Sequence, residues 1–115
     1  MSRMMFVDLE KIPYQEIAPG VRIRAPYGEK IMLSLLEMEE GTEVPLHDHP
    51  HEQAGMLLEG RMKLTIGGET RIVEPGSSYF IPPNVAHGAI AFDGPVKTLD
   101  VFSPIREDYA KWRKE

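Results

Sequence analysis

Three of the four histidines in this chain, His47, His49 and His87, have a spacing that suits the binding of one metal ion. His47 and His49 are separated by one residue, and alternate residues of a β-strand point to the same face of the sheet. Neutral imidazole is the usual nitrogen ligand for zinc, copper, iron and nickel. The pair can therefore offer two imidazoles to one ion, and a third is available from His87, which glycine and proline frame. We predict a metal site built from these three residues.

Two further residues compete for a fourth ligand position. His51 and Gln53 continue the alternation, so on an unbroken strand they would share a face with the histidine pair and crowd a single ion. Pro50 cannot donate a hydrogen bond to a central strand ladder, which predicts a break or bulge between His49 and His51. The spacing alone leaves both His51 and Gln53 open as ligands.

The two histidine-containing stretches resemble the signature motifs of the cupin superfamily. Residues 41–60 read Gly-x5-His-x-His-x3-Gln-x6-Gly, and residues 76–91 contain Gly-x5-Pro-x-Asn-x2-His. The resemblance to small, single-domain cupins covers positions 41 to about 90. It implies a mainly β fold, a single cupin β-barrel of the double-stranded β-helix or jelly-roll type. It also implies one divalent ion (Ni, Zn, Fe or Mn) held by the ligand set His47, His49, Gln53 and His87.

Three positions depart from the family pattern. Asn84 replaces a glycine, which is tolerable because asparagine adopts the left-handed conformation in turns. Ala91 replaces a terminal asparagine outside the ligand set. Gln53 stands where a glutamate is usual, so three imidazoles and an amide would leave the ion its full positive charge. The site should then be a stronger Lewis acid and should attract anionic substrates.

A second set of candidates follows the last long apolar segment. Asp100 and Phe102 have the same strand parity, and a carboxylate placed among apolar residues must be paired, solvated or functional. Arg106 lies where the chain leaves this strand, so a structural salt bridge to Asp100 is one interpretation. Residues 99–108 also resemble the C-terminal stretch of cupins from pectin and alginate breakdown, which open 4,5-unsaturated uronates to linear keto-sugars. That resemblance implies that Asp100, Phe102 and Arg106 line the site.

Three functions are compatible with these residues. The resemblance favours an enzyme in which the ion polarises a sugar oxygen, Arg106 holds the substrate carboxylate and Asp100 transfers a proton. One alternative is a dioxygenase, with Fe(II) or Mn(II) on the same ligands and open positions for oxygen and substrate. The other is a cupin that binds a small ligand without catalysis. Oxygen consumption would identify the second function, and absence of any turnover the third.

Short β-strands must position these residues, because ten prolines and ten glycines divide the chain into short segments. Gly67-Gly68 indicates a two-residue hairpin. Ser103-Pro104 is followed first by acidic and then by basic residues, a pattern that predicts a short C-terminal helix. Tyr109 and Trp112 would pack this helix onto the barrel. The expected strands lie at 31–38, 62–66, 71–73, 79–81, 89–92 and 96–102.

Length and composition restrict the remaining possibilities. The 115 residues predict one domain spanning positions 1–115, with an ordinary 42% hydrophobic and 27% charged content. The absence of cysteine excludes disulfides and thiol chemistry, and with no signal peptide in view it favours the cytoplasm. A net charge of −5 argues against nucleic acid as a partner, and no apolar run is long enough for a membrane helix. We expect a small anionic substrate and a homodimer, since cupin barrels commonly pair and sheet edges need protection.

Overall fold

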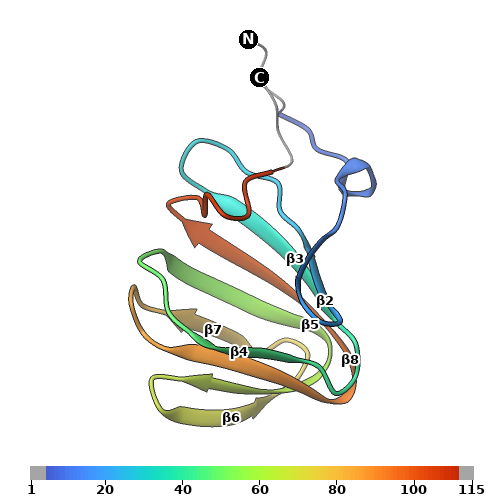
Figure 1. The fold of residues 1–115 in the computed structure, drawn as a ribbon, viewed down its shortest axis with the longest axis vertical. Helices are drawn as coiled ribbons and strands as arrows, with labels where there is room; N and C mark the ends of the chain where they lie inside the picture. The colour runs from blue at the N-terminus through green and yellow to red at the C-terminus, as the bar shows by residue number, and fades with distance from the viewer. Residues whose placement is uncertain (1–4, 112–115) are drawn as a thin grey trace.

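The computed structural model describes residues 5–111 and consists almost entirely of antiparallel β-structure (Figure 1). A single 3-10 turn at Leu9–Lys11 precedes eight strands. These are β1 (Gln15–Ala18), β2 (Val21–Arg24), β3 (Met32–Met38), β4 (Glu43–His47), β5 (Glu52–Ile66), β6 (Glu69–Val73), β7 (Ser78–Ile81) and β8 (His87–Ser103). The predicted mainly β fold is confirmed.

The sheet is open, and its two longest strands fold it back on itself. Its main path runs β1-β2-β3-β8-β5-β6, with β4 attached to β8 and β7 attached to β5. The first part of β8 pairs with β4 and with the end of β5, whereas its last part pairs with β3 and with the start of β5. Register shifts between Leu57 and Met62 mark where the two long strands bend. Because of this bend, β8 begins and ends on the same side of the molecule (Figure 1).

Most of the strands expected from the sequence are present. The strand expected at 31–38 is β3 (Met32–Met38), and the Gly67-Gly68 hairpin joins β5 to β6 with Ile66 opposite Glu69. Both hairpin glycines have positive φ, as this tight turn requires. The segments expected separately at 89–92 and 96–102 are parts of the single strand β8.

Alternating side chains of these strands point into a common interior. Along β8, Thr98, Asp100 and Phe102 are buried, whereas the residues between them are more exposed. The apolar core forms two clusters, and Ile17 and Leu36 pack against both. The inward face of β8 therefore carries polar groups into an otherwise apolar interior.

The predicted C-terminal helix is wrong for the part of the tail that the structure describes. Residues 104–111 form turns, in which the Tyr109 N–H donates to Arg106 O and the Ala110 N–H donates to Glu107 O. The Ser103 hydroxyl donates to Lys30 O, so this side chain does not cap a helix. Isolated helices of such length are marginal in water, and here contacts with the sheet determine the conformation instead. Tyr109 does pack on the sheet, at 6.0 Å between its ring centroid and that of Phe102, and Trp112 lies outside the described residues.

Within residues 5–111, no helix has the length and apolar character needed to cross a membrane.

Candidate metal centre

The three predicted histidines lie together at the junction of two paired strands. His47 is the last residue of β4 and His87 the first residue of β8, and the two are register partners. Ring centroids are 4.3 Å apart for His47 and His87, 4.8 Å for His49 and His87, and 5.6 Å for His47 and His49. One ring nitrogen from each residue lies within 4.8 Å of the other two.

His49 reaches this cluster from a connection and not from a strand. Strand β4 ends at His47 and β5 begins at Glu52, so the predicted break at Pro50 is confirmed. The Asn84 N–H donates to the His49 carbonyl at 2.8 Å and ties this connection to the turn before β8. Asn84 has φ 65°, the left-handed conformation that asparagine tolerates in place of glycine.

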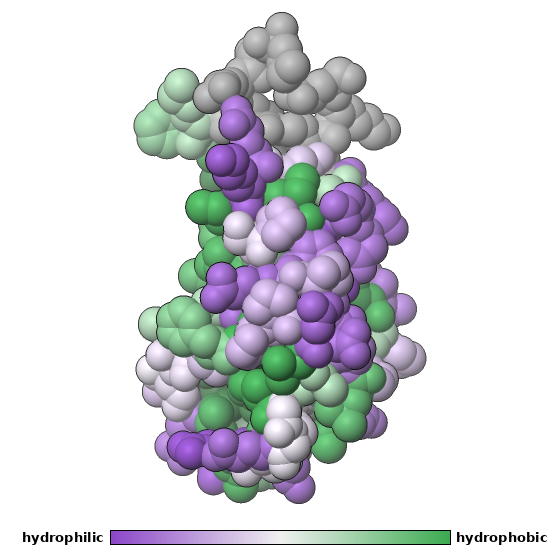
Figure 2. All heavy atoms as spheres, turned by 90° about the vertical axis from the view of Figure 1, so that its left-hand side faces the viewer, coloured by the Kyte–Doolittle hydropathy of each residue, from purple (hydrophilic) through white to green (hydrophobic). Residues whose placement is uncertain are grey.

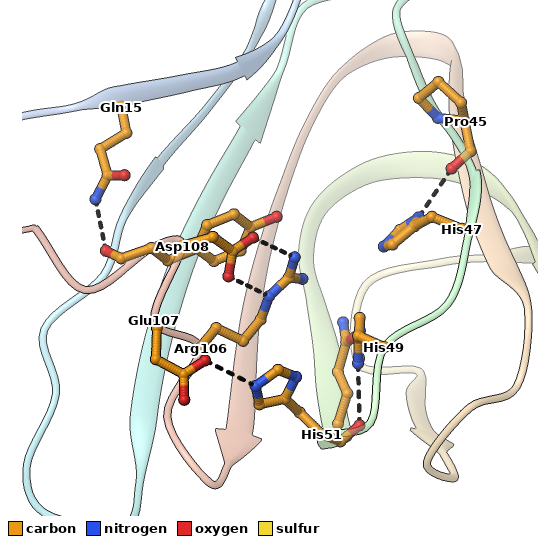
Figure 3. A network of polar contacts seen from close by, with 10 residues as sticks. Gln15, Pro45, His47, His49, His51, Arg106, Glu107 and Asp108 are labelled. Atoms are coloured by element: carbon orange, nitrogen blue, oxygen red, sulfur yellow. Dashed lines mark hydrogen bonds and ion pairs between the residues drawn. The ribbon is translucent and has the colours of Figure 1, made fainter.

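The orientation of each ring is fixed by its backbone. Nδ1 of His47, His49 and His87 lies 2.8–3.0 Å from the carbonyls of Pro45, His51 and Val85. Figure 3 shows the first two of these contacts. A proton on Nδ1 that is donated to a carbonyl leaves the lone pair on Nε2, the arrangement typical of metal-binding histidine.

The surroundings of His49 and His87 favour the neutral form of these two imidazoles. Burial lowers the pKa of His87 to about 4. Burial, followed by the positive charge of Arg106, also lowers the pKa of His49. Neutral imidazole is the form that binds a metal, so both residues are ready to do so at neutral pH.

These donors fit a divalent metal ion. The Nε2 atom of His87 is buried and has no hydrogen-bond partner among residues 5–111, which is costly for a polar atom unless something binds there. Three neutral imidazole nitrogens that converge on one point are the donor set used for Zn, Fe, Ni and Mn.

Gln53 lies beside this cluster, and His51 lies between the cluster and the tail. The Gln53 side-chain oxygen is 3.0 Å from His49 Nε2, so an oxygen ligand is available on the side of the ring that would face an ion. The His51 ring is also buried, but its Nε2 is 3.8 Å from the Glu107 carboxylate. In Figure 3 the His51 side chain points toward this tail residue.

Asp100 is a buried carboxylate that has donors on both oxygens. The Tyr79 hydroxyl donates to Oδ1 at 2.9 Å, and the Gln53 amide nitrogen donates to Oδ2 at 2.5 Å. Burial raises the pKa of Asp100, whereas hydrogen bonds from Gln53, Thr98 and Tyr79 act in the opposite direction. Tyr79 was not among the site residues predicted from the sequence. Its inward strand parity and the need of a buried tyrosine hydroxyl for a partner were the signals that could have revealed this contact.

Arg106 pairs with Asp108 and not with Asp100, so the salt bridge considered from the sequence does not form. The guanidinium donates to the two Asp108 carboxylate oxygens at 3.2 and 2.8 Å. It also lies 3.9 Å from the centroid of the Tyr109 ring and 5.1 Å from that of Phe102. Burial alone would raise the pKa of Asp108, but the hydrogen bond and charge of Arg106 outweigh it and lower that pKa.

One cavity brings most of the candidate residues together, although His49 is not part of its lining. Its polar lining includes His47, Gln53, His87, Asp100 and Arg106, and the Phe102 ring forms part of its apolar wall. An outer cleft shares His47, Arg106 and Tyr109 with this cavity, so these residues lie at its entrance. Figure 2 shows the left-hand side of Figure 1, where β8 begins and ends. Hydrophilic residues cross the middle of this surface.

Comparison with protein families gives a match over most of the sheet. The family model described as Cupin domain matches residues 34–102. This range contains both histidine motifs, Gln53, Asp100 and Phe102, and it ends before Arg106.

The curated relatives found by sequence include a pectin degradation protein and an isomerase. The pectin degradation protein KdgF of Dickeya dadantii is 27% identical over 109 residues, which are 93% of this chain and 98% of that protein. The H2HPP isomerase of Bacillus subtilis is 30% identical over 102 residues, and the match spans 87% of this chain but only 43% of that protein.

Solved structures with the same fold include two of similar size. An RmlC-like cupin from Shewanella frigidimarina superposes with a TM-score of 0.84 at 28% identity, covering 94% of this chain and 97% of that one. KdgF from Halomonas sp. superposes with a TM-score of 0.82 at 26% identity, covering 93% of this chain and 98% of that one. The chain is thus similar to both structures along nearly its whole length.

Proposed function

This chain belongs to the cupin family, and from that premise we propose that it is a metal-dependent enzyme that opens the ring of an unsaturated uronate, or a related sugar acid, to the linear keto form. The observation that carries the proposal is the shared cavity: Asp100, Phe102 and Arg106 line the same space as His47 and His87. The similarity to KdgF, a protein named for pectin degradation, supports this substrate class. The similarity to an isomerase supports the reaction class, because ring opening is an isomerisation.

The ligand set in this proposal is His47, His49, Gln53 and His87. A divalent ion bound there would act as a Lewis acid on a sugar oxygen. His51 is outside the set because its ring nitrogen faces Glu107 in the tail.

Arg106 would bind and orient the substrate carboxylate. Its guanidinium is buried at the cavity entrance and already holds one carboxylate in a two-point contact. A sugar carboxylate can form the same pair of hydrogen bonds.

Asp100 would move the proton. Ring opening removes the proton of the anomeric hydroxyl, breaks the bond between the anomeric carbon and the ring oxygen, and adds a proton to a carbon of the double bond. No co-reactant is consumed, so one acid/base group at the ring can serve both transfers. Burial favours the neutral form of the Asp100 carboxyl and so raises its pKa toward the working range of a general acid.

The test follows the loss of the conjugated C=C absorbance of unsaturated galacturonate or mannuronate, at saturating metal. We expect wild type to accelerate the reaction and the His47→Ala/His49→Ala double variant to be inactive and metal-free, whereas His51→Ala keeps its metal. Asp100→Asn should reduce kcat by ~10²–10⁴-fold, because it removes the proton-transfer group. Arg106→Ala should act largely through KM, because the carboxylate contact is lost.

Asp93→Asn is the matched control for Asp100→Asn, since Asp93 pairs with Arg61 at the surface. It should leave both constants unchanged. No acceleration by wild type over the spontaneous reaction, across several uronates and metals, would overturn the proposal. Oxygen consumption on addition of a substrate would then favour the dioxygenase.

A further inference from the structure

Four polar side chains form a continuous series of polar contacts from the interior of the sheet to the histidine cluster. Tyr79 donates to Asp100, Asp100 accepts from the Gln53 amide nitrogen, and the Gln53 amide oxygen faces His49 Nε2. Tyr79, Asp100 and Gln53 are all buried and come from three neighbouring strands, β7, β8 and β5. These contacts therefore connect Asp100, which is outside the ligand set, to the Gln53 side-chain oxygen beside the candidate metal centre.

Hydrogen-bond chemistry determines which end of the Gln53 amide faces Asp100. When Asp100 is ionised, its two oxygens can only accept, whereas a glutamine side chain has one accepting and one donating end. If the Gln53 amide were reversed, its oxygen would lie against the Asp100 carboxylate and its N–H groups would point at the cluster. The Asp100 carboxylate therefore selects the orientation in which the amide oxygen faces the histidines.

We propose that Asp100 is a positioning residue for the metal centre: it fixes the Gln53 side-chain oxygen toward the ion, and Tyr79 holds Asp100 in place for this. This inference rests on the metal-binding part of the proposed function and does not depend on the substrate. It adds a role to Asp100 that is separate from proton transfer.

A glycine makes room for the tyrosine that holds the carboxylate. Gly55 is the register partner of both Asp100 and Tyr79. A Cβ atom at Gly55 would lie 2.5 Å from two carbons of the Tyr79 ring and 2.6 Å from its hydroxyl oxygen. The φ angle of Gly55 is not positive, so the position needs glycine for this close approach and not for its backbone conformation.

The experiment is a double-mutant cycle on metal affinity, with Zn²⁺ alone titrated against a chromophoric chelator. We expect Asp100→Asn to weaken Zn²⁺ binding by about 10–100-fold, the usual range for a residue that orients a ligand. Asparagine can present either end of its amide to Gln53, so the orientation is no longer forced. Gln53→Ala should give a loss of similar size, and the double variant should bind no more weakly than Gln53→Ala alone.

The cycle separates positioning from a general effect of negative charge. If Asp100 acted only through its charge, the losses of the two single variants would multiply in the double variant, and the proposal would be overturned. Equal Zn²⁺ affinity of wild type and Asp100→Asn would overturn it as well. Tyr79→Phe should weaken binding, whereas Tyr14→Phe, which loses a hydrogen bond to Glu37 at the surface, should not.

The Zn²⁺ titration and the uronate turnover assay test the two proposals separately. Wild type that binds Zn²⁺ tightly but turns over no uronate would retire the proposed substrate and leave the positioning role intact. Wild type that binds no Zn²⁺ would overturn both proposals. Thermal unfolding of each variant confirms that the comparison is made between folded proteins.

Discussion

At the scale of single residues, the site depends on histidines that remain neutral inside the protein. His87 is only 4% exposed, and burial lowers its pKa to about 4. The same residue in the unfolded chain has a pKa near ~6.5. The folded and unfolded states therefore bind different numbers of protons between these two values.

This difference predicts that the metal-free protein loses stability as the pH falls from about 6.5 to 4. In that window the unfolded state takes up a proton at His87 and the folded state does not, so unfolding becomes more favourable. The contribution of His87 is on the order of 3 kcal/mol at its largest and stays constant below the folded pKa. The measurement is urea unfolding of chelator-treated protein at several pH values.

The matched variant is His87→Gln, which keeps a polar side chain but does not titrate. Carboxyl groups titrate in the same range in both proteins, so the difference between the two pH profiles isolates the histidine. Equal slopes for wild type and His87→Gln would contradict the assignment of a buried neutral imidazole.

The residues of the histidine cluster could be predicted from spacing, but their orienting partners could not. His47, His49 and His87 belong to short motifs whose residue types and intervals indicate shared geometry. The contact of Tyr79 with Asp100 depends instead on the register of two strands that both pair with β5. Register across strands separated by 20 or more residues leaves little trace in local sequence.

At the scale of elements, the C-terminal tail borders the candidate site, and its residues 104–111 do not form a helix. Turns in residues 104–111 place Arg106 over Phe102 and place Asp108 on the guanidinium (Figure 3). The helix was predicted from a capping residue, a proline and a charge pattern, which describe local preference alone. Tertiary contacts of Arg106 and Tyr109 override that preference, and they could not be read from the tail itself.

The pairing of Arg106 with Asp108 predicts that Asp108 weakens the binding of the proposed anionic substrate. Asp108 accepts hydrogen bonds from two nitrogens of the guanidinium, so a substrate carboxylate that binds Arg106 as proposed has to compete with it for these groups. Asp108→Asn should therefore lower KM for an unsaturated uronate by roughly 3–10-fold, because a neutral amide competes less well for the guanidinium than a carboxylate. Steady-state kinetics at fixed, saturating metal would measure the change.

Glu107→Gln is the control for this variant, since it removes the same charge from the neighbouring position without touching Arg106. Its carboxylate lies near His51 instead. If both variants changed KM equally, the effect would come from net charge and the specific competition would be ruled out.

At the scale of the whole molecule, the outer face of the sheet is unusually apolar. Register places Leu33 beside Val101, Val101 beside Ala54, and Ala54 beside Phe80, in one row across four strands. Leu35, Leu99 and Met56 form a second row next to it. Phe80 is 72% exposed and Met56 43% exposed, so this face is open in the single chain. Contiguous apolar surface of this kind marks an interaction site more often than scattered residues do.

The overall architecture could be predicted from the sequence only in part. Strand alternation and turn residues predicted a mainly β domain, and the structure confirms it. They did not distinguish a closed barrel from an open sheet, because closure depends on which of the distant strands pair at the ends. In the described part of the chain, β1 and β6 end the path without pairing with each other.

We expect the homodimer predicted from the sequence to form through this outer face. In a symmetric dimer each copy contributes the same patch, so the two apolar rows of one copy would cover those of the other. Phe80→Glu should then give a monomer, because it places a charge in a desolvated contact. The fold should survive, since the Phe80 side chain points away from the core. Size-exclusion chromatography with light scattering measures the mass of wild type and variant. Ile72→Glu serves as the control on β6, where an apolar side chain that is 50% exposed lies outside the two rows. A wild-type monomer at tens of micromolar, or a Phe80→Glu variant that remains a dimer, would contradict this interface.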